Sequence, residues 1–130
     1  LLDLDNFKQV NDHFGHIEGD KLLIETAEKL EKFCRSTDKV GRLGGDEFII
    51  LLRSVAEKDV DPLVSRLLKR VQKAYDQSGV VIAVTASIGI AHYPQDGKSF
   101  ADLYHCADIA LYDAKHKGKN QYSQYRKIGP

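Results

Sequence analysis

The sequence lacks several features that define particular classes of protein. Its 19 basic and 19 acidic side chains give a formal net charge of +0, so no overall positive field would attract nucleic acid or an anionic membrane. No apolar run approaches the roughly 20 residues of a membrane-spanning helix, and no secretory signal opens the chain. The only cysteines, Cys34 and Cys106, have apolar neighbours, which favours reduced thiols over a disulfide framework or metal cluster. We therefore expect a cytoplasmic protein.

Internal repeats and low-complexity segments are also missing, and the five histidines have no metal-ligand spacing. A chain of 130 residues fits one domain, which we expect to span residues 1–130 without a linker. Its first residues, "LLDLDNF", have the pattern of a buried strand already under way. We therefore expect this domain to be truncated at its N-terminus relative to the complete protein.

The spacing of apolar residues predicts an α+β protein. Asp20, Asp61 and Ser99 are the expected N-caps of helices, and residues 6–19 are expected to form a polar loop. The predicted strands cover residues 1–4, 39–43, 48–53, 80–93 and 120–125, and the predicted helices cover 20–34, 61–79 and 99–118. This order predicts a ferredoxin-like (βαββαβ) sheet followed by an additional C-terminal helix and strand.

Acidic residues gather at one place in this predicted fold. The first strand lies beside the third, so Asp3 should approach the hairpin tip where Asp46 and Glu47 follow Gly44 and Gly45. Three close carboxylates repel one another, and Mg²⁺ would compensate them while sharing its oxygen ligands with a phosphate substrate. An isolated Asp-Glu pair would be better explained as surface acids that merely solubilise a turn than as a metal site. The third acid, and glycines that admit a substrate to the backbone, favour a metal site.

Five motifs carry a family resemblance. Besides "GGDEF" itself, the sequence contains "DLDNFKQVND", "FGHIEGD", "TASIGIA" and "ADIALYDAKHKGKN" in the corresponding order. Over nearly its whole length the chain resembles the GGDEF family of diguanylate cyclase domains, although the usual upstream helix with a "DxLTGLxNRR"-like pattern is missing. This resemblance implies a palm-type sheet related to nucleotidyl cyclases. It also implies that two GTP molecules are joined into the bacterial second messenger cyclic di-GMP, with release of pyrophosphate.

The resemblance also implies roles for single residues. Asp3, Asp46, Glu47 and the Leu4 carbonyl would hold two Mg²⁺ ions for each GTP, with Mn²⁺ as an alternative, and Asp46, Glu47 and Lys8 would be the catalytic residues. The implied GTP-binding residues are Asn6, Phe7, Lys8, Asn11, Asp20, Gly44, Gly45, Lys115 and Lys119.

Two of these GTP-binding assignments compete with a structural role. A carboxylate at Asp20 can accept hydrogen bonds from guanine N1–H and the N2 amine, which adenine lacks at those positions; we favour this role over the N-cap. Lys115 and Lys119 match positions that face the terminal phosphates, but helix C-terminal lysines also satisfy the helix dipole. Lys119 stands where family members commonly carry Arg. Lysine keeps the positive charge but lacks the planar guanidinium that binds a phosphate through two parallel hydrogen bonds.

The segment "RSTD" matches the family's RxxD inhibitory motif. The resemblance implies that Arg35, Asp38 and Arg66 bind the product and inhibit the enzyme from a separate site. Because each domain would bind one GTP, catalysis implies a homodimer, controlled by an upstream sensor or regulatory domain. Two rival hypotheses remain: a catalytically silent GGDEF domain that acts as a receptor for GTP or cyclic di-GMP, and an unrelated ferredoxin-like binding module.

Overall fold

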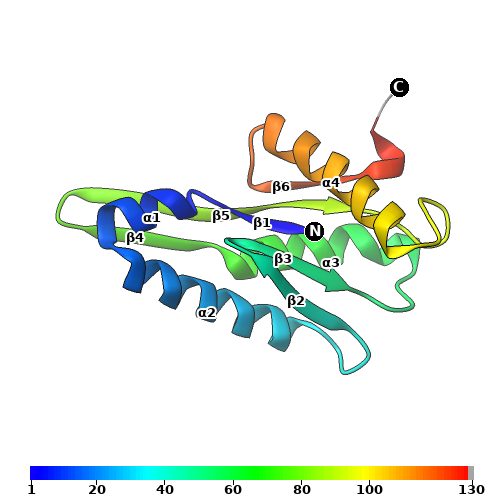
Figure 1. Ribbon diagram of the computed structural model, residues 1–130, viewed down its shortest axis with the longest axis horizontal. Helices are drawn as coiled ribbons and strands as arrows, with labels where there is room; N and C mark the ends of the chain where they lie inside the picture. The colour runs from blue at the N-terminus through cyan, green and yellow to red at the C-terminus, as the bar shows by residue number, and fades with distance from the viewer. Residues whose placement is uncertain (129–130) are drawn as a thin grey trace.

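The computed structural model describes residues 1–128, which form a sheet with helices on both of its faces (Figure 1). The elements in chain order are β1 (Leu2–Asp5), α1 (Phe7–Phe14), α2 (His16–Phe33), β2 (Lys39–Gly44), β3 (Glu47–Leu51), α3 (Glu57–Val71), β4 (Lys73–Gln77), β5 (Val80–Ile90), α4 (Phe100–His116), β6 (Gln121–Gln124) and a 3₁₀ turn (Tyr125–Lys127). The strands run in the order β2-β3-β1-β5-β4, and β6 pairs with β5 in parallel. The predicted ferredoxin-like arrangement, with β1 beside β3 and an additional helix and strand, is confirmed.

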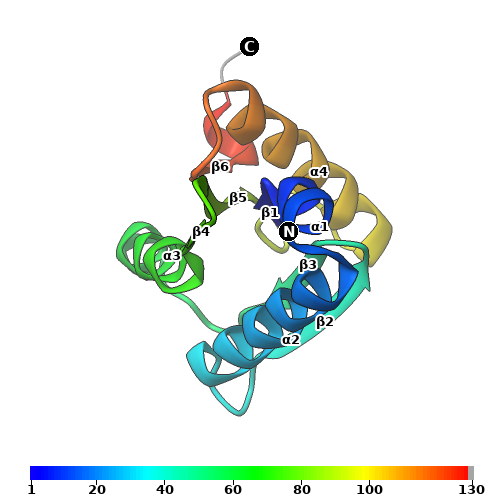
Figure 2. The ribbon, with the colours of Figure 1, turned by 90° about the vertical axis from the view of Figure 1, so that its left-hand side faces the viewer.

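The two faces of the sheet carry different side chains of β1, apolar on one face and acidic on the other. Helices α2 and α3 cover one face and α4 covers the other (Figure 2). Because side chains alternate along a strand, Leu2 and Leu4 point into the core beneath α2 and α3, whereas Asp3 and Asp5 point to the α4 side. Phe48 of β3 is also buried in that core. The alternation therefore places the acids of β1 opposite α4.

Helix α4 packs closely on the sheet. It begins at Ser99, whose side chain accepts a hydrogen bond from the N–H of Asp102, as the sequence predicts. Where α4 crosses β5, Gly89 has no side chain to hold the helix away, and a Cβ there would lie 2.1 Å from the carbonyl oxygen of Ala107. This glycine sets the height of α4 above the strands. Within the described residues, no helix combines the length and the apolarity needed to cross a membrane.

The prediction of a polar loop over residues 6–19 is wrong. Helix α1 occupies residues 7–14 and buries Val10 completely, and α2 already begins at His16. Between the two helices the chain turns at Gly15, where φ is +90°. Asp20 consequently lies inside α2 and is exposed, so the expectation that it caps this helix is also wrong.

The predicted helix over residues 61–79 is partly wrong. Helix α3 begins at Glu57, so Pro62 lies inside it, and the helix ends at Val71. The chain then forms β4, and the loop residues Ser78 and Gly79, with φ of 52° and 79°, close a two-residue hairpin to β5. Tyr75, expected on the helix, is instead buried from β4.

Candidate functional site

The acids expected to bind metal meet at the junction of β1, β3 and α4. Asp3 is the cross-strand partner of Glu47, and the N–H of Leu4 donates to the carbonyl oxygen of Asp46 at 3.1 Å. From α4, the ammonium group of Lys115 forms an ion pair with Oδ2 of Asp3. The structure therefore brings together five of the residues selected from the sequence, and the hairpin pairing is what aligns them.

The carboxyl groups at this junction interact unfavourably. Burial, followed by the charge of Asp3, raises the pKa of Asp46 to about 6, although Lys115 acts in the opposite direction. Oδ1 of Asp3 is buried and has no hydrogen-bond partner in the described structure. A buried carboxylate oxygen without a donor is costly unless a cation or proton satisfies it. The electrostatics of Asp3 and Asp46 thus suit a bound cation.

Glu47 makes a contact that the sequence does not predict. No group of three or more His, Cys, Asp or Glu side chains in residues 1–128 is arranged to hold a metal ion. Oε1 of Glu47 instead accepts a hydrogen bond of 3.1 Å from the hydroxyl of Tyr104 on α4. The adjacent carboxylates of Asp3 and Asp46 suit an oxygen-bound ion such as Mg²⁺. Glu47 lies beside them and is hydrogen-bonded to α4.

The glycine turn leaves open space at the hairpin tip. Gly44 and Gly45 have φ values of 138° and 53°, and nothing lies within 4 Å of where their Cβ atoms would be. The Nε of Arg42 donates to the carbonyl oxygen of Gly45 at 2.9 Å, which stabilises the turn, and a register shift separates Arg42 from Gly44. A ligand can therefore approach the backbone directly ahead of Asp46.

The start of α1 provides donors for a phosphate group. Asn6 adopts the left-handed conformation with φ of 67°, and its Nδ2 donates to the carbonyl oxygen of Ala83 at 2.8 Å. Phe7 and Lys8 then form the first turn of the helix, where backbone N–H groups lack intrahelical partners. Lys8 and Lys119 are both exposed, and Lys119, with φ of 62°, lies in the turn after α4.

Asn11 and Asp20 come together although they belong to different helices. The side chain of Asn11 occupies the space above Gly19, since a Cβ at Gly19 would lie 1.8 Å from its Oδ1. Asp20 follows immediately on α2 and is exposed. Because Asp20 does not cap the helix, its carboxylate has no competing structural task there. Their recognition of guanine stays a prediction.

Asp5 has a structural task, in contrast to Asp3. Its buried carboxylate accepts hydrogen bonds from the hydroxyls of Thr85 and Ser87 at 2.7 and 2.8 Å and from the N–H of Asn120 at 3.0 Å. These bonds tie β1 to β5 and to the segment that follows α4. A carboxylate that already accepts three hydrogen bonds is a poor metal ligand, so Asp5 differs from Asp3, the other acid of the "DLD" segment.

The "RSTD" segment forms a compact turn between α2 and β2. The Asp38 carboxylate is buried, accepts the backbone N–H groups of Arg35 and Arg53 at 2.9 and 3.0 Å, and also accepts the Arg35 guanidinium. The guanidinium lowers the pKa of Asp38 to about 2. Arg35 remains 55% exposed, and Arg66 lies over the ring of Phe33 at 5.7 Å. Strand β2 places this turn about 20 Å from the glycine turn. Product binding here stays a prediction.

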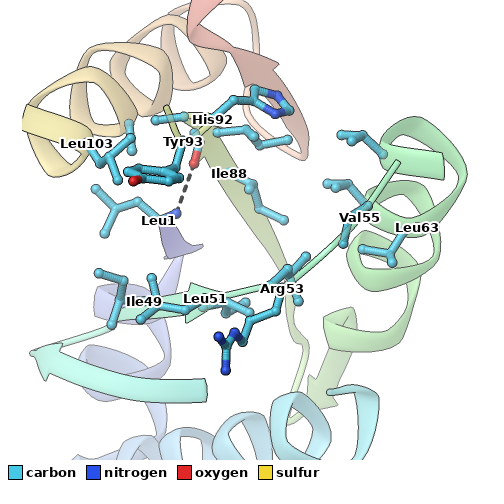
Figure 3. Close-up of a pocket in the computed structure, with 18 of the residues that line it drawn as sticks. Leu1, Ile49, Leu51, Arg53, Val55, Leu63, Ile88, His92, Tyr93 and Leu103 are labelled. Atoms are coloured by element: carbon cyan, nitrogen blue, oxygen red, sulfur yellow. Dashed lines mark hydrogen bonds between the residues drawn. The ribbon is translucent and has the colours of Figure 1, made fainter. Parts of the chain in front are cut away.

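A cavity of about 510 Å³ lies apart from the acids (Figure 3). The cavity is lined by Leu1 and by residues of β3 and β5. Helices α3 and α4 contribute mainly apolar side chains such as Leu63 and Leu103. Such a lining offers little to a triphosphate, so the acid junction is the better candidate site. Tyr104 connects the two places, because it is one of the residues that line the cavity and its hydroxyl contacts Glu47.

Comparison with known proteins adds an independent observation. A family model described as "Diguanylate cyclase, GGDEF domain" matches residues 1–121. The bifunctional diguanylate cyclase/cyclic di-GMP phosphodiesterase MucR of Pseudomonas aeruginosa is 46% identical over 122 residues, which cover 94% of this chain and 18% of MucR. The chain thus spans less than a fifth of the length of this relative.

Solved structures give the same result for the fold. The GGDEF domain of PA1120 (YfiN or TpbB) from Pseudomonas aeruginosa superposes with a TM-score of 0.84 and 34% identity, covering 95% of this chain and 78% of that one. The GGDEF domain of DgcB from Caulobacter crescentus, in complex with c-di-GMP, gives 0.83 and 27%, covering 97% and 75%. The expected palm-type fold is confirmed.

Proposed function

We propose, since the chain belongs to the GGDEF family of diguanylate cyclase domains, that it is itself a diguanylate cyclase. Two GTP molecules would form two 3′–5′ phosphodiester bonds in cyclic di-GMP, and two pyrophosphate ions would leave. One observation carries this proposal: Asp3 and Asp46 form a partly buried pair of acids in which Oδ1 of Asp3 has no donor, directly beside an open glycine turn.

The acid pair would hold the metal ions. Asp3 and Asp46, together with Glu47 and the Leu4 carbonyl, are the proposed ligands of two Mg²⁺ or Mn²⁺ ions. Such ions, when bound, assist deprotonation of the attacking 3′-hydroxyl and neutralise charge that develops at the α-phosphate. Asp46 and Glu47 would also orient the attacking hydroxyl. Lys115 is already paired with Asp3, so it can pass to a nearby phosphate once the acids are neutralised.

The remaining groups would bind and select the nucleotide. The triphosphate would be bound by the free N–H groups of Phe7 and Lys8, which lie at the positive end of the α1 dipole. The cations of Lys8 and Lys119 would add to this attraction. At the other end of the ligand, Asn11 and Asp20 would accept and donate hydrogen bonds on the guanine edge. The exposed Asp20 carboxylate supplies the acceptors that favour GTP over ATP.

Catalysis would require two copies of the chain. Each site holds one GTP, whereas each product needs two, so a two-fold symmetric homodimer would present the 3′-hydroxyl of one nucleotide to the α-phosphate of the other. We further propose that product binds at Arg35, Asp38 and Arg66 and opposes this pairing. The DgcB domain, which has a similar fold, was solved in complex with c-di-GMP, so binding of this molecule by such a fold is compatible with the proposal.

A receptor without catalytic activity is the second candidate. MucR, the relative described above, has a bifunctional name, so the name alone does not assign cyclase activity to this region. The preformed Arg35 and Asp38 turn is compatible with ligand binding in either case. The two candidates differ in whether the acid junction turns over GTP.

Substitution of Asp46 tests the proposal. Asp46→Ala should reduce formation of cyclic di-GMP at least ~100-fold, because the metal ions lose a ligand that no neighbour replaces. Asp76→Ala, which removes an exposed acid from β4, is the matched control and should keep the parent rate. Equal turnover in the parent and in Asp46→Ala would refute the acid junction as the catalytic site.

A further inference from the structure

Tyr104 and Glu47 are joined by a hydrogen bond that the family assignment does not explain. They lie 57 residues apart in the sequence, on α4 and β3, yet the hydroxyl and Oε1 are 3.1 Å apart. We propose that Tyr104 is a positioning residue, which orients the Glu47 carboxylate toward the metal ions of the active site. This inference rests on the proposed function, since it concerns the same site.

The position of the tyrosine ring is fixed by its surroundings. The ring packs against the apolar cluster of Leu1, Ala107 and Leu111, and Phe100 lies beside it with ring centroids 6.0 Å apart. Helix α4 cannot shift freely, because its backbone contacts β5 at Gly89. With only two side-chain torsions, a packed tyrosine presents its hydroxyl at a defined point. Tyr104 is therefore a rigid donor.

Glu47, by contrast, has a flexible side chain with three torsions, at the first position of β3 after the glycine turn. A single donor on Oε1 removes much of this freedom and leaves the second oxygen available to a cation. Hydrogen bonds from neutral hydroxyls to carboxylates are stronger than those between neutral groups. Groups that orient a metal ligand in this way commonly change metal affinity or activity by 10–100-fold when they are removed.

Helix α4 thus holds two of the acids at once. Tyr104, Ala107, Leu111 and Lys115 follow at spacings of three, four and four residues, so they share one face of the helix. The two middle residues pack onto the sheet, while Tyr104 contacts Glu47 and Lys115 contacts Asp3. The orientation of both carboxylates consequently depends on one helix.

The test removes the hydroxyl and keeps the ring. Affinity for 3′-deoxy-GTP, which lacks the attacking hydroxyl, would be titrated calorimetrically over a range of Mg²⁺ concentrations for the parent, Tyr104→Phe and Tyr112→Phe. Tyr112 is the matched control, because it lies on α4, is exposed and stacks on His116. Tyr104→Phe should need about 10-fold more Mg²⁺ for half-maximal binding. Its affinity at saturating Mg²⁺ and its melting temperature should stay near the parent values, as should everything measured for Tyr112→Phe.

A double substitution separates positioning from general destabilisation. In a Glu47→Ala background, Tyr104→Phe should cause no further change in Mg²⁺ dependence, because the two side chains act through one contact. Parent-like Mg²⁺ dependence in Tyr104→Phe, or fully additive effects, would overturn the inference. If the parent binds 3′-deoxy-GTP in a Mg²⁺-dependent way but does not turn over GTP, the cyclase proposal alone is refuted. If binding of 3′-deoxy-GTP does not depend on Mg²⁺, both the cyclase proposal and this inference are refuted.

Discussion

Gly89 of β5 lies directly beneath Ala107 of α4, so that a Cβ on the glycine would meet the carbonyl oxygen of Ala107 at 2.1 Å. The same Cβ would lie 2.3 Å from the backbone nitrogen of Leu111. Both obstacles are backbone atoms, which cannot rotate away as a side chain could. The contact fixes how far α4 stands above the sheet, and hence where Tyr104 and Lys115 meet the acids.

Gly89→Ala should strongly destabilise the protein, because α4 must move outward to admit the methyl group. Overpacking of this kind costs about 1–3 kcal/mol or more, and we expect the upper end because backbone must shift. Urea unfolding measures the change. Gly41→Ala is the control, since a Cβ there meets only Ile49 at an ordinary 3.4 Å. Equal midpoints for the two variants would show that α4 is not held at this point.

Asp38 should make the stability of the protein depend on pH. Its pKa is lowered from 3.8 to about 2 by Arg35, so its ionised form stabilises the folded state above about pH 4 and this contribution disappears as the pH falls toward 2. Asp38→Asn should therefore lower the free energy of unfolding at pH 7 by about 2 kcal/mol. The difference from the parent, measured by urea unfolding, should narrow between pH 4 and pH 2. A difference that stays constant over this range would contradict the assignment.

Asp20 should determine the choice of base. Asp20→Ala should weaken GTP binding at least ~10-fold and leave ATP binding unchanged, since only guanine loses hydrogen-bond acceptors for N1–H and the N2 amine. Calorimetric titration of both nucleotides provides the measurement. Lys21→Ala, at the adjacent exposed position of α2, is the control and should retain the preference for GTP. Equal affinities of the parent for GTP and ATP would refute this role.

Arg35 should bind product independently of catalysis, because its turn lies at the opposite end of β2 from the glycines. Cyclic di-GMP should bind to Asp46→Ala as tightly as to the parent, whereas Arg35→Ala should lose at least ~10-fold in affinity and retain turnover. Calorimetry on both variants decides the matter. If Arg35→Ala binds product like the parent, "RSTD" only closes the turn after α2.

The elements that could be predicted from the sequence were those whose local pattern agrees with their tertiary environment. Strand β5 is rich in β-branched residues, and α4 has both a serine cap and a regular apolar face. The β2–β3 hairpin was predicted from its glycines, and its pairing with β1 placed Asp3 next to Glu47 as expected.

The failures have physical causes. Residues 7–14 contain asparagine, aspartate and histidine, which are weak helix formers, and α1 is stabilised instead by burying Val10 and packing on α2. Tyr75 continues the apolar spacing of Val71, which suggests a longer helix, but pairing with β5 decides in favour of β4. The Ser78-Gly79 pair carried the hairpin signal that could have identified β4.

The contact between Tyr104 and Glu47 could not be derived from the sequence. It depends on the height of α4 above the sheet, which Gly89 determines through a close approach of two backbones. By contrast, the GGDEF motif was sufficient to select Asp46 and Glu47, because the turn and the two acids are contiguous in the chain.

The central claim is that this chain converts GTP into cyclic di-GMP. The most direct test incubates the protein with GTP and Mg²⁺ at several protein concentrations and quantifies all nucleotides and pyrophosphate by chromatography. We predict one cyclic di-GMP and two pyrophosphate ions for every two GTP consumed, with a specific activity that rises with protein concentration because two copies must meet. Recovery of unaltered GTP at every protein concentration, from a protein that nevertheless binds it, would contradict the claim and identify a receptor.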